Sequence, residues 1–253
     1  EKQLNDATQK TGHENLILDP ENKTVKFRVE GMKLDLGGIA KGLAIDRAVE
    51  LLKKNGCEAG MVDIGGDIRC FGNAPQNRKK WKIGLQNPKK DESILLTLNL
   101  EDNAVATSGD YRRFYTIENK KFSHIFDPHS AESARNMASV SIIAPTAIKA
   151  DALATAASVM GLKKAAQLIN SIADTEALFI KADSEEIIAS ENADRFIAKK
   201  EVQRIKLYQN KKESESMYKT YRVKKTPAPP ALNGSWDGPL WSKTKTIIID
   251  NYM

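Results

Sequence analysis

Residues 34–46 have the sequence LDLGGIAKGLAID, the stretch in which extended backbone turns into helix. Apolar residues recur at helical spacing after the turn and predict a helix over residues 39–52. Gly37 and Gly38 precede this helix, and Lys41 lies one turn into it. Such a start favours phosphate binding, because the first backbone amides of a helix lack partners within it. A tight turn that needs glycine for a positive φ explains the same residues equally well.

A second motif, ADALAT at residues 150–155, lies in an alanine-rich stretch that predicts another helix. Asp151 and Thr155 are four residues apart, so their side chains share one face of that helix. Mg²⁺ prefers oxygen ligands and commonly takes one or two carboxylates from the protein. The motif therefore predicts a cation site. The alternative is a helix in which the Thr155 hydroxyl bonds back to the Asp151 carbonyl.

Two further motifs carry carboxylates next to loops. Residues 63–67, DIGGD, lie at the end of a predicted strand, and the spacing alone favours a tight turn between the two acids. Residues 123–128, SHIFDP, place His124 three positions before Asp127. Histidine is the side chain best suited to accept a proton near neutral pH, although a lone histidine in a strand is more often structural.

Along residues 24–180, strand-like and helix-like patterns alternate, with glycine, proline and asparagine between them. The fold class we expect is mixed α/β, of the α+β type, with mixed sheets and flanking helices. The expected strands are residues 24–29, 60–64, 81–85, 94–100, 115–117, 139–143 and, as the last one, 177–180; the expected helices are residues 39–52, 146–160 and 162–172.

Composition and charge exclude several classes of protein. With 41% hydrophobic and 28% charged residues among 253, the chain has globular proportions. Of the 39 basic and 33 acidic residues, 12 and 5 lie in residues 199–253, which leaves 27 against 28 in residues 1–198. The net charge of +6 therefore comes from the C-terminal part, and no nucleic acid is expected as a partner. Cys57 and Cys70 leave a disulfide and two free thiols equally open.

Taken together, these motifs resemble the ApbE family, the FAD:protein FMN transferases. The resemblance covers residues 31–197 and implies an ApbE-like domain that is incomplete at its N-terminus. It also implies an enzyme that transfers FMN from FAD to a Ser or Thr hydroxyl of a target protein and releases AMP, with Mg²⁺ between the phosphates and the protein. The segments that carry the resemblance are LDLGGIAKGLAID, VDIGGDIR, ATSGDYRR, HIFDP and ADALATAA.

The resemblance further implies roles for single residues. His124 matches the catalytic histidine, which takes the proton of the acceptor hydroxyl, and we place Asp127 with it in the catalytic group. The implied metal ligands are Asp151, Thr155 and the backbone carbonyl of Gly38, and the implied contacts to FAD are Asp35, Lys41 and Ile125.

We expect three parts along the chain. Residues 1–198 form the flavin transferase domain, residues 199–230 a charged linker that contains proline, and residues 231–253 the start of another module. The sequence ALNGSWDGPLWSKTKTIIIDNY in that last part resembles the opening of family 9 carbohydrate-binding β-sandwich modules, which implies a carbohydrate partner. An aromatic linker explains the same residues nearly as well.

Two other functions fit the same motifs. With water as the acceptor, the site is an FAD pyrophosphatase that gives free FMN and AMP, and without turnover it is a flavin-binding module. The family resemblance implies a periplasmic or cell-envelope location and attachment as a lipoprotein.

Overall fold

The computed structural model describes residues 7–76, 78–90, 92–109, 114–117, 120–123, 126–127, 137–182, 184 and 186–208. The chain divides into two units, Glu1–Asn210 and Lys211–Met253, and every described residue lies in the first. The module expected at residues 231–253 lies outside the described residues and stays a prediction.

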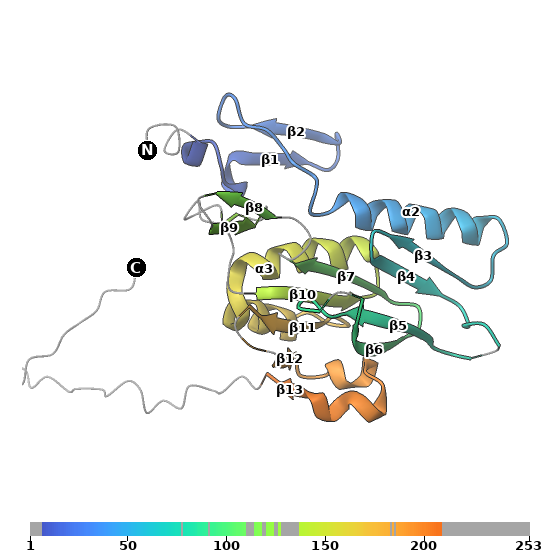
Figure 1. The fold of residues 1–253 in the computed structure, drawn as a ribbon. Coiled ribbons are helices and arrows are strands. Elements are labelled where there is room, and N and C mark those ends of the chain that lie inside the picture. The colour runs from blue at the N-terminus through green and yellow to red at the C-terminus, as the bar shows by residue number, and fades with distance from the viewer. Residues whose placement is uncertain are drawn as a thin grey trace, which may run out of the picture. The chain divides into compact units, whose positions relative to one another are not determined.

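The helices α2 (Ala40–Lys54) and α3 (Ala147–Asn170) and a set of mostly short strands make up most of the described part (Figure 1). The structure also has the 3₁₀ turns η1 (His13–Asn15), η2 (Ala193–Phe196) and η3 (Lys199–Arg204). The strands are β1 (Leu16–Asp19), β2 (Thr24–Phe27), β3 (Gly60–Ile64), β4 (Asp67–Phe71), β5 (Trp81–Gln86), β6 (Ile94–Leu100), β7 (Ala104–Gly109), β8 (Phe114–Ile117), β9 (Lys120–Ser123), β10 (Met137–Ala144), β11 (Glu176–Lys181), β12 (Ile187–Ala189) and β13 (Ile205–Leu207).

A seven-stranded sheet with the order β13-β12-β11-β10-β7-β4-β3 forms the centre of this unit. Its neighbours are antiparallel except β12 and β13, which are parallel. Three two-stranded sheets, β1–β2, β5–β6 and β8–β9, complete the strands. The mixed α/β fold class expected from the sequence is confirmed.

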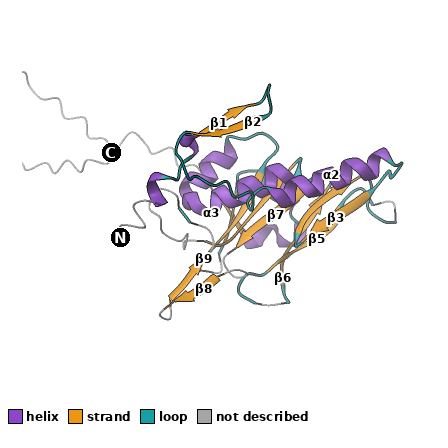
Figure 2. Cartoon of the chain, turned by 90° about the horizontal axis from the view of Figure 1, so that it is seen from above, coloured by secondary structure: helices purple, strands orange, loops and turns teal. Residues whose placement is uncertain are grey.

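Each face of the central sheet carries its own hydrophobic core. Val140 and Ile142 of β10 pack with α2 and the alanines of α3, whereas Ile143 packs on the opposite side with the leucines of β6. This alternation follows from the two-residue period of a strand. Figure 2 shows α2 and α3 close together. Both helices contribute residues to the core that contains Val140 and Ile142, so both lie on one face of the sheet.

The long helix α3 contains a break at Gly161, whose φ of 74° and ψ of 165° are not helical. Glycine adopts a positive φ without the steric cost that other residues meet. The expected end of one helix at this glycine and the start of a second after it are therefore confirmed.

The C-terminal side of the fold extends further than the sequence pattern indicates. The strand expected to be the last, near residues 177–180, is followed by β12 and β13, so that expectation is wrong. Arg204 Nη1 donates to the Leu95 carbonyl at 2.6 Å, and the Glu201 carboxylate accepts the Thr97 N–H at 2.8 Å. These contacts join residues 199–207 to the folded body, past the boundary expected at residue 198.

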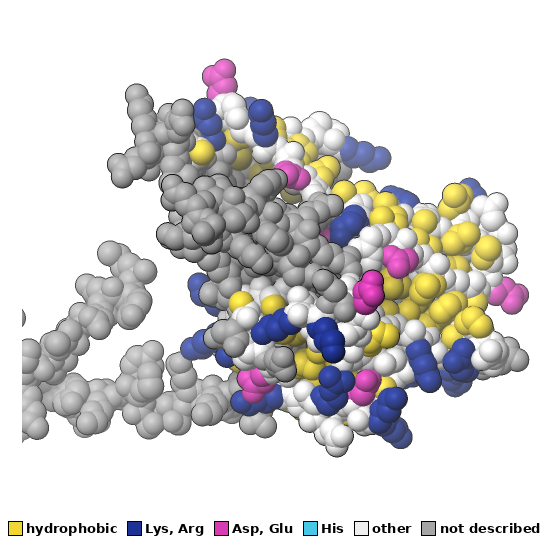
Figure 3. Space-filling view, viewed as in Figure 1, with side chains coloured by type: hydrophobic (Ala, Val, Ile, Leu, Met, Phe, Trp, Pro, Cys, Tyr) yellow, Lys and Arg dark blue, Asp and Glu magenta, His cyan; other side chains and the backbone are white. Residues whose placement is uncertain are grey.

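Exposed apolar side chains gather, in the view of Figure 3, over the end of the unit that carries α2, β3 and β5. Leu51, Met61 and Ile94 are among the large apolar residues exposed on the molecule.

Both cysteines are free thiols, Cys57 exposed and Cys70 buried, so of the two alternatives, a disulfide or two free thiols, the structure has the second. Neither described helix combines the length and apolarity needed to cross a membrane.

Candidate functional site

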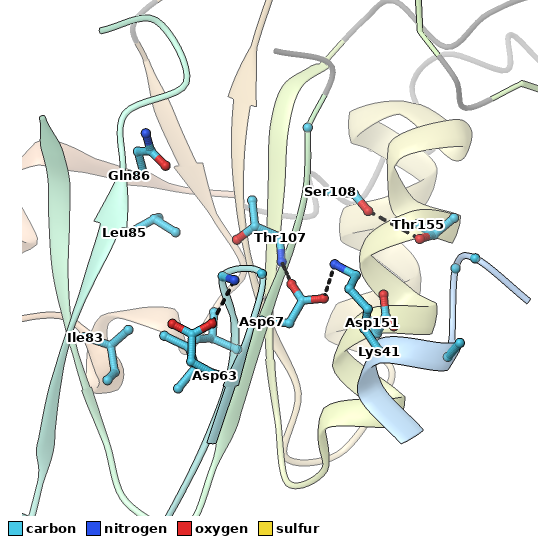
Figure 4. A pocket seen from close by; sticks show the side chains of 18 of the residues that line it. Lys41, Asp63, Asp67, Ile83, Leu85, Gln86, Thr107, Ser108, Asp151 and Thr155 are labelled. Carbon is cyan, nitrogen blue, oxygen red and sulfur yellow. Dashed lines mark hydrogen bonds and ion pairs between the residues drawn. The ribbon is translucent and has the colours of Figure 1, made fainter. Parts of the chain in front are cut away.

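One pocket of about 1030 Å³ collects most of the sequence motifs. Its walls include the start of α2, the β3–β4 turn, β5, β7 and α3 (Figure 4). Its volume is at the upper end of the range for small-molecule sites, which suits a ligand of dinucleotide size. Lys41, Asp151 and Thr155 lie on the side of α2 and α3. Ile83 and Leu85 of β5 lie across from them.

The glycine turn before α2 lies directly against α3. A Cβ on Gly38 would be 3.2 Å from Oγ1 and 3.0 Å from Cγ2 of Thr155. The Thr155 hydroxyl in turn lies 3.3 Å from Oγ of Ser108 on β7 (Figure 4). The turn, the helix and the strand therefore meet around one hydroxyl group, although they are far apart in the sequence.

Asp151 lies one helical turn before Thr155 and is 4% exposed. Its Oδ2 accepts the N–H of Gly42 at 2.9 Å, which ties α3 to α2. Burial raises the pKa of Asp151 and the charge of Asp67 raises it further, whereas the Gly42 N–H and the Lys41 ammonium lower it. Burial disfavours a charged carboxylate, and a neighbouring cation favours it. The site thus holds a carboxylate that would gain from a bound cation.

Lys41 and Asp67 form an ion pair in the pocket. The Lys41 ammonium lies 2.5 Å from Oδ2 of Asp67. Oδ1 of Asp67 accepts the Thr107 N–H of β7 at 3.1 Å. Asp67 is 2% exposed and is held by β7, so it fixes the direction of the more exposed Lys41 side chain (Figure 4).

The expected anion site at the start of α2 is largely used by the protein itself. The Gly37 N–H donates to Asp35 Oδ1 at 2.7 Å, and the N–H groups of Ile39 and Ala40 donate to the Leu36 carbonyl. The Gly42 N–H donates to Asp151. These four amides thus already donate to a loop carboxylate, a turn carbonyl and α3. Phosphate binding at the start of α2 stays a prediction.

The residues at this junction fit a small hard cation. Asp151, Thr155 and the Gly38 carbonyl offer only oxygen donors, and Mg²⁺ binds such donors while it keeps water or phosphate oxygens in the other positions. Within the described ranges, no group of three or more His, Cys, Asp and Glu side chains is placed to hold a metal ion. A site with one carboxylate is thus the arrangement that these residues offer.

Other predicted site residues have different outcomes. Asp35 lines the pocket, next to the glycine turn. Asp127 is described and partly buried, but it is not among the described residues that line the pocket. His124 and Ile125 lie outside the described residues, so their roles stay predictions. Phe126, their neighbour, reaches the pocket wall.

Sequence reasoning missed part of the wall. Ile83, Leu85 and Gln86 of β5 line the pocket, although β5 carries no motif. The β3–β4 turn holds Gly65 and Gly66 at φ of 65° and 91°, which confirms the tight turn expected in DIGGD. The same turn also faces the pocket, which its spacing did not reveal.

Comparisons with known proteins agree with the family resemblance. The model of the ApbE family matches residues 1–179. A relative named FAD:protein FMN transferase from Treponema pallidum (strain Nichols) is 37% identical over 169 residues, which are 63% of this chain and 47% of the relative. Another of the same name from Klebsiella pneumoniae (strain 342) is 30% identical over 188 residues, 74% of this chain and 57% of the relative. The chain thus spans about half the length of these relatives.

Solved structures show the same fold. An ApbE protein from Thermotoga maritima superimposes with a TM-score of 0.70 at 34% identity, over 78% of this chain and 63% of that protein. The flavin transferase ApbE from Vibrio cholerae gives a TM-score of 0.67 at 28% identity, over 78% of this chain and 62% of that one.

Proposed function

This chain belongs to the ApbE family, and we propose that it transfers FMN from FAD to a Ser or Thr hydroxyl of a target protein, with Mg²⁺ as cofactor and AMP as the other product. One observation carries the proposal: Asp151 and Thr155 of α3 and Gly38 before α2 line one pocket, with Lys41 beside them. The relatives named FAD:protein FMN transferase support the same reaction.

The charges that line the pocket support the need for a cation. Among the described lining residues, four carboxylates, those of Asp35, Asp63, Asp67 and Asp151, face a single ammonium, that of Lys41. A diphosphate would be repelled by such a lining, and four of the amides around the start of α2 already donate to groups of the chain itself. A bound Mg²⁺ would neutralise charge on the phosphates and hold them for displacement.

The residues of the chain then have separate tasks. Asp151, Thr155 and the Gly38 carbonyl would hold the ion, and Lys41, directed by Asp67, would contact a phosphate oxygen. Apolar side chains of β5 would exclude water from one side of the ligand. His124, by the family resemblance, would accept the hydroxyl proton of the acceptor.

The bonds that change are those of one substitution at phosphorus. The acceptor oxygen forms a bond to the phosphorus of the FMN half, and the bond from that phosphorus to the bridging oxygen breaks. AMP leaves with the bridging oxygen, and the proton of the hydroxyl passes to the imidazole of His124. Positioning and charge neutralisation supply most of the catalysis in such transfers.

Product analysis tests the proposal. The protein is incubated with FAD, MgCl₂ and an acceptor protein, and the products are separated with and without EDTA. The proposal predicts covalent flavin on the acceptor and free AMP, both lost with EDTA. Free FMN with unmodified acceptor would identify a pyrophosphatase instead, and intact FAD would identify a binding module.

A pair of variants on α3 sharpens this test. Thr155→Ala removes the hydroxyl next to Gly38 and should raise the Mg²⁺ concentration needed for half-maximal transfer. Ser158→Ala is the matched control, because its hydroxyl donates to the Ala154 carbonyl within the same helix. Equal Mg²⁺ dependence in both variants would remove Thr155 from the proposed site.

We extend the proposal to location and to a further partner. The family resemblance supports a periplasmic or cell-envelope location with lipoprotein attachment, and the sequence of residues 231–253 supports a carbohydrate partner. Cell fractionation tests the location, and pull-down on insoluble polysaccharides tests the partner. A protein that is found in the cytosol and binds none of the polysaccharides would contradict both extensions.

A further inference from the structure

A buried carboxylate outside the proposed metal ligands holds the start of α3. Asp46 lies on α2 and is 6% exposed. Its Oδ1 accepts the N–H of Ala147 and its Oδ2 accepts the N–H of Ile148, both at 2.9 Å. The first amides of a helix need partners from outside it, and a carboxylate is favoured there by the helix dipole. Thr146, the N-cap residue of α3, makes no side-chain capping bond, so α2 supplies the cap.

The same carboxylate is held from the sheet. Nη1 of Arg69 on β4 lies 2.6 Å from Oδ1 of Asp46, and the Arg69 side chain is 17% exposed. The position of Asp46 is thus set by its own helix and by the sheet together. The start of α3 is thereby attached to a rigid point rather than to a mobile side chain.

A second carboxylate makes the reverse connection between the two helices. Asp151 of α3 accepts the Gly42 N–H of α2, as described above. At the same place the backbones are so close that a Cβ on Gly42 would meet the Ala147 carbonyl oxygen. Each helix therefore gives one carboxylate to backbone amides in the first turns of the other.

The contacts follow one another in a simple register. Gly38 contacts Thr155, Gly42 contacts Asp151, and Asp46 contacts Ala147. From one contact to the next, the residue number rises by four along α2 and the turn before it, and falls by four along α3. Four residues are about one helical turn, so three successive turns are matched between antiparallel segments. If the start of α3 slid along the helix axis relative to Asp46, Thr155 would move away from the Gly38 turn.

We propose that Asp46 is a positioning residue for the metal site, two helical turns from the ion itself. Its two bonds to the start of α3 set the axial position at which Asp151 and Thr155 reach the Gly38 turn. The inference rests on the proposed function, because the ion is the Mg²⁺ of that proposal. Residues that orient metal ligands typically change metal affinity by about 10–100-fold when they are replaced.

Mn²⁺ binding to the whole 253-residue chain tests the inference without any turnover. Electron paramagnetic resonance counts free Mn²⁺ in a titration, and hydrogen exchange reports the amides of Ala147 and Ile148. Asp46→Asn should raise the Mn²⁺ dissociation constant about tenfold or more and should speed exchange at the two amides. Glu50→Gln, one turn further along α2 and paired with exposed Arg47, is the control and should match the wild type.

A second variant covers the case in which Asp46→Asn does not fold. Asp46→Glu keeps the charge that faces Arg69 but adds one methylene, so it should stay folded while it displaces α3 and weakens Mn²⁺ binding. Wild-type affinity in either folded Asp46 variant would overturn the inference and leave the proposed function intact. Absence of Mn²⁺ binding in the wild type would instead overturn the metal site of the proposed function.

Discussion

Replacement of Gly42 by alanine tests the close approach of α2 and α3. A Cβ at this position would lie 2.6 Å from Ile148 Cα and 2.7 Å from the Ala147 carbonyl carbon, and closer still to its oxygen. These are backbone atoms, so the clash cannot be relieved by a change of rotamer. The two helices must move apart, and the Gly42 N–H bond to Asp151 must lengthen.

The expected cost has three contributions. Overpacking of a tight interior typically costs about 1–3 kcal/mol, and a weakened hydrogen bond to a charged group costs about 1.5–3 kcal/mol. Alanine is the better helix former by about 1 kcal/mol, which offsets part of this loss. A net loss of about 2–4 kcal/mol would lower Tm by roughly 5–15 °C in a protein of this size.

Thermal unfolding of Gly42→Ala followed by circular dichroism measures this loss. Ala44→Gly is the control on the same helix, because Ala44 is exposed and its replacement costs only the helix propensity, about 1 kcal/mol. The reasoning requires Gly42→Ala to be the less stable variant although it gains the better helix former. A Gly42→Ala protein as stable as the wild type would refute the close packing of α2 on α3.

Three further predictions concern charge and access. Because burial raises the pKa of Asp151, the metal-free native state binds the Asp151 proton more tightly than the unfolded chain does, and stability falls as pH rises from ~3.9 through the native pKa. Asp151→Asn should therefore have a higher Tm than the wild type at pH 7. A difference in Tm that persists below pH ~3.9 would contradict this. The pH midpoint of Mn²⁺ binding should move down in Asp67→Asn and up in Lys41→Met, and unshifted midpoints would argue against the charge contacts. Cys57 should react at once with a thiol reagent in native protein, whereas Cys70, whose pKa burial raises to about 12, should react only after unfolding; equal rates would contradict the buried position.

Local patterns in the sequence were sufficient for the two helices. The apolar spacing after Gly38 and the alanine-rich run before Gly161 depend on neighbours within one or two turns, and both helices lie close to the expected residues. The i, i+4 spacing of Asp151 and Thr155 likewise set the two oxygens on one face before any tertiary contact was known.

The sheet was harder to predict, because its strands depend on distant partners. β4 and β7 carry glycine, serine or aspartate of low strand propensity, yet they pair with each other as inner strands of the sheet. β13 follows a charged stretch and is a strand only because β12 lies beside it. Pairing across many residues leaves no periodic signal in the short segments that take part.

The supporting residues of the site were missed for the same reason. Asp46 ends the LDLGGIAKGLAID motif, but no spacing gave it a role, because its partners, Ala147 and Ile148, follow about a hundred residues later. Asp67 stood in a recognised motif, but its contacts to Lys41 and Thr107 come from other elements. Motif spacing identified the residues nearest the proposed ion, and only the fold revealed what holds them.

The most direct measurement is a crystal structure of the chain with Mn²⁺ and ADP, in which anomalous scattering locates the ion. The account predicts one ion bound by the Asp151 carboxylate, the Thr155 hydroxyl and the Gly38 carbonyl, with phosphate oxygens on its open side. An ion bound elsewhere in the pocket, with Asp151 still held only by Gly42, would contradict it.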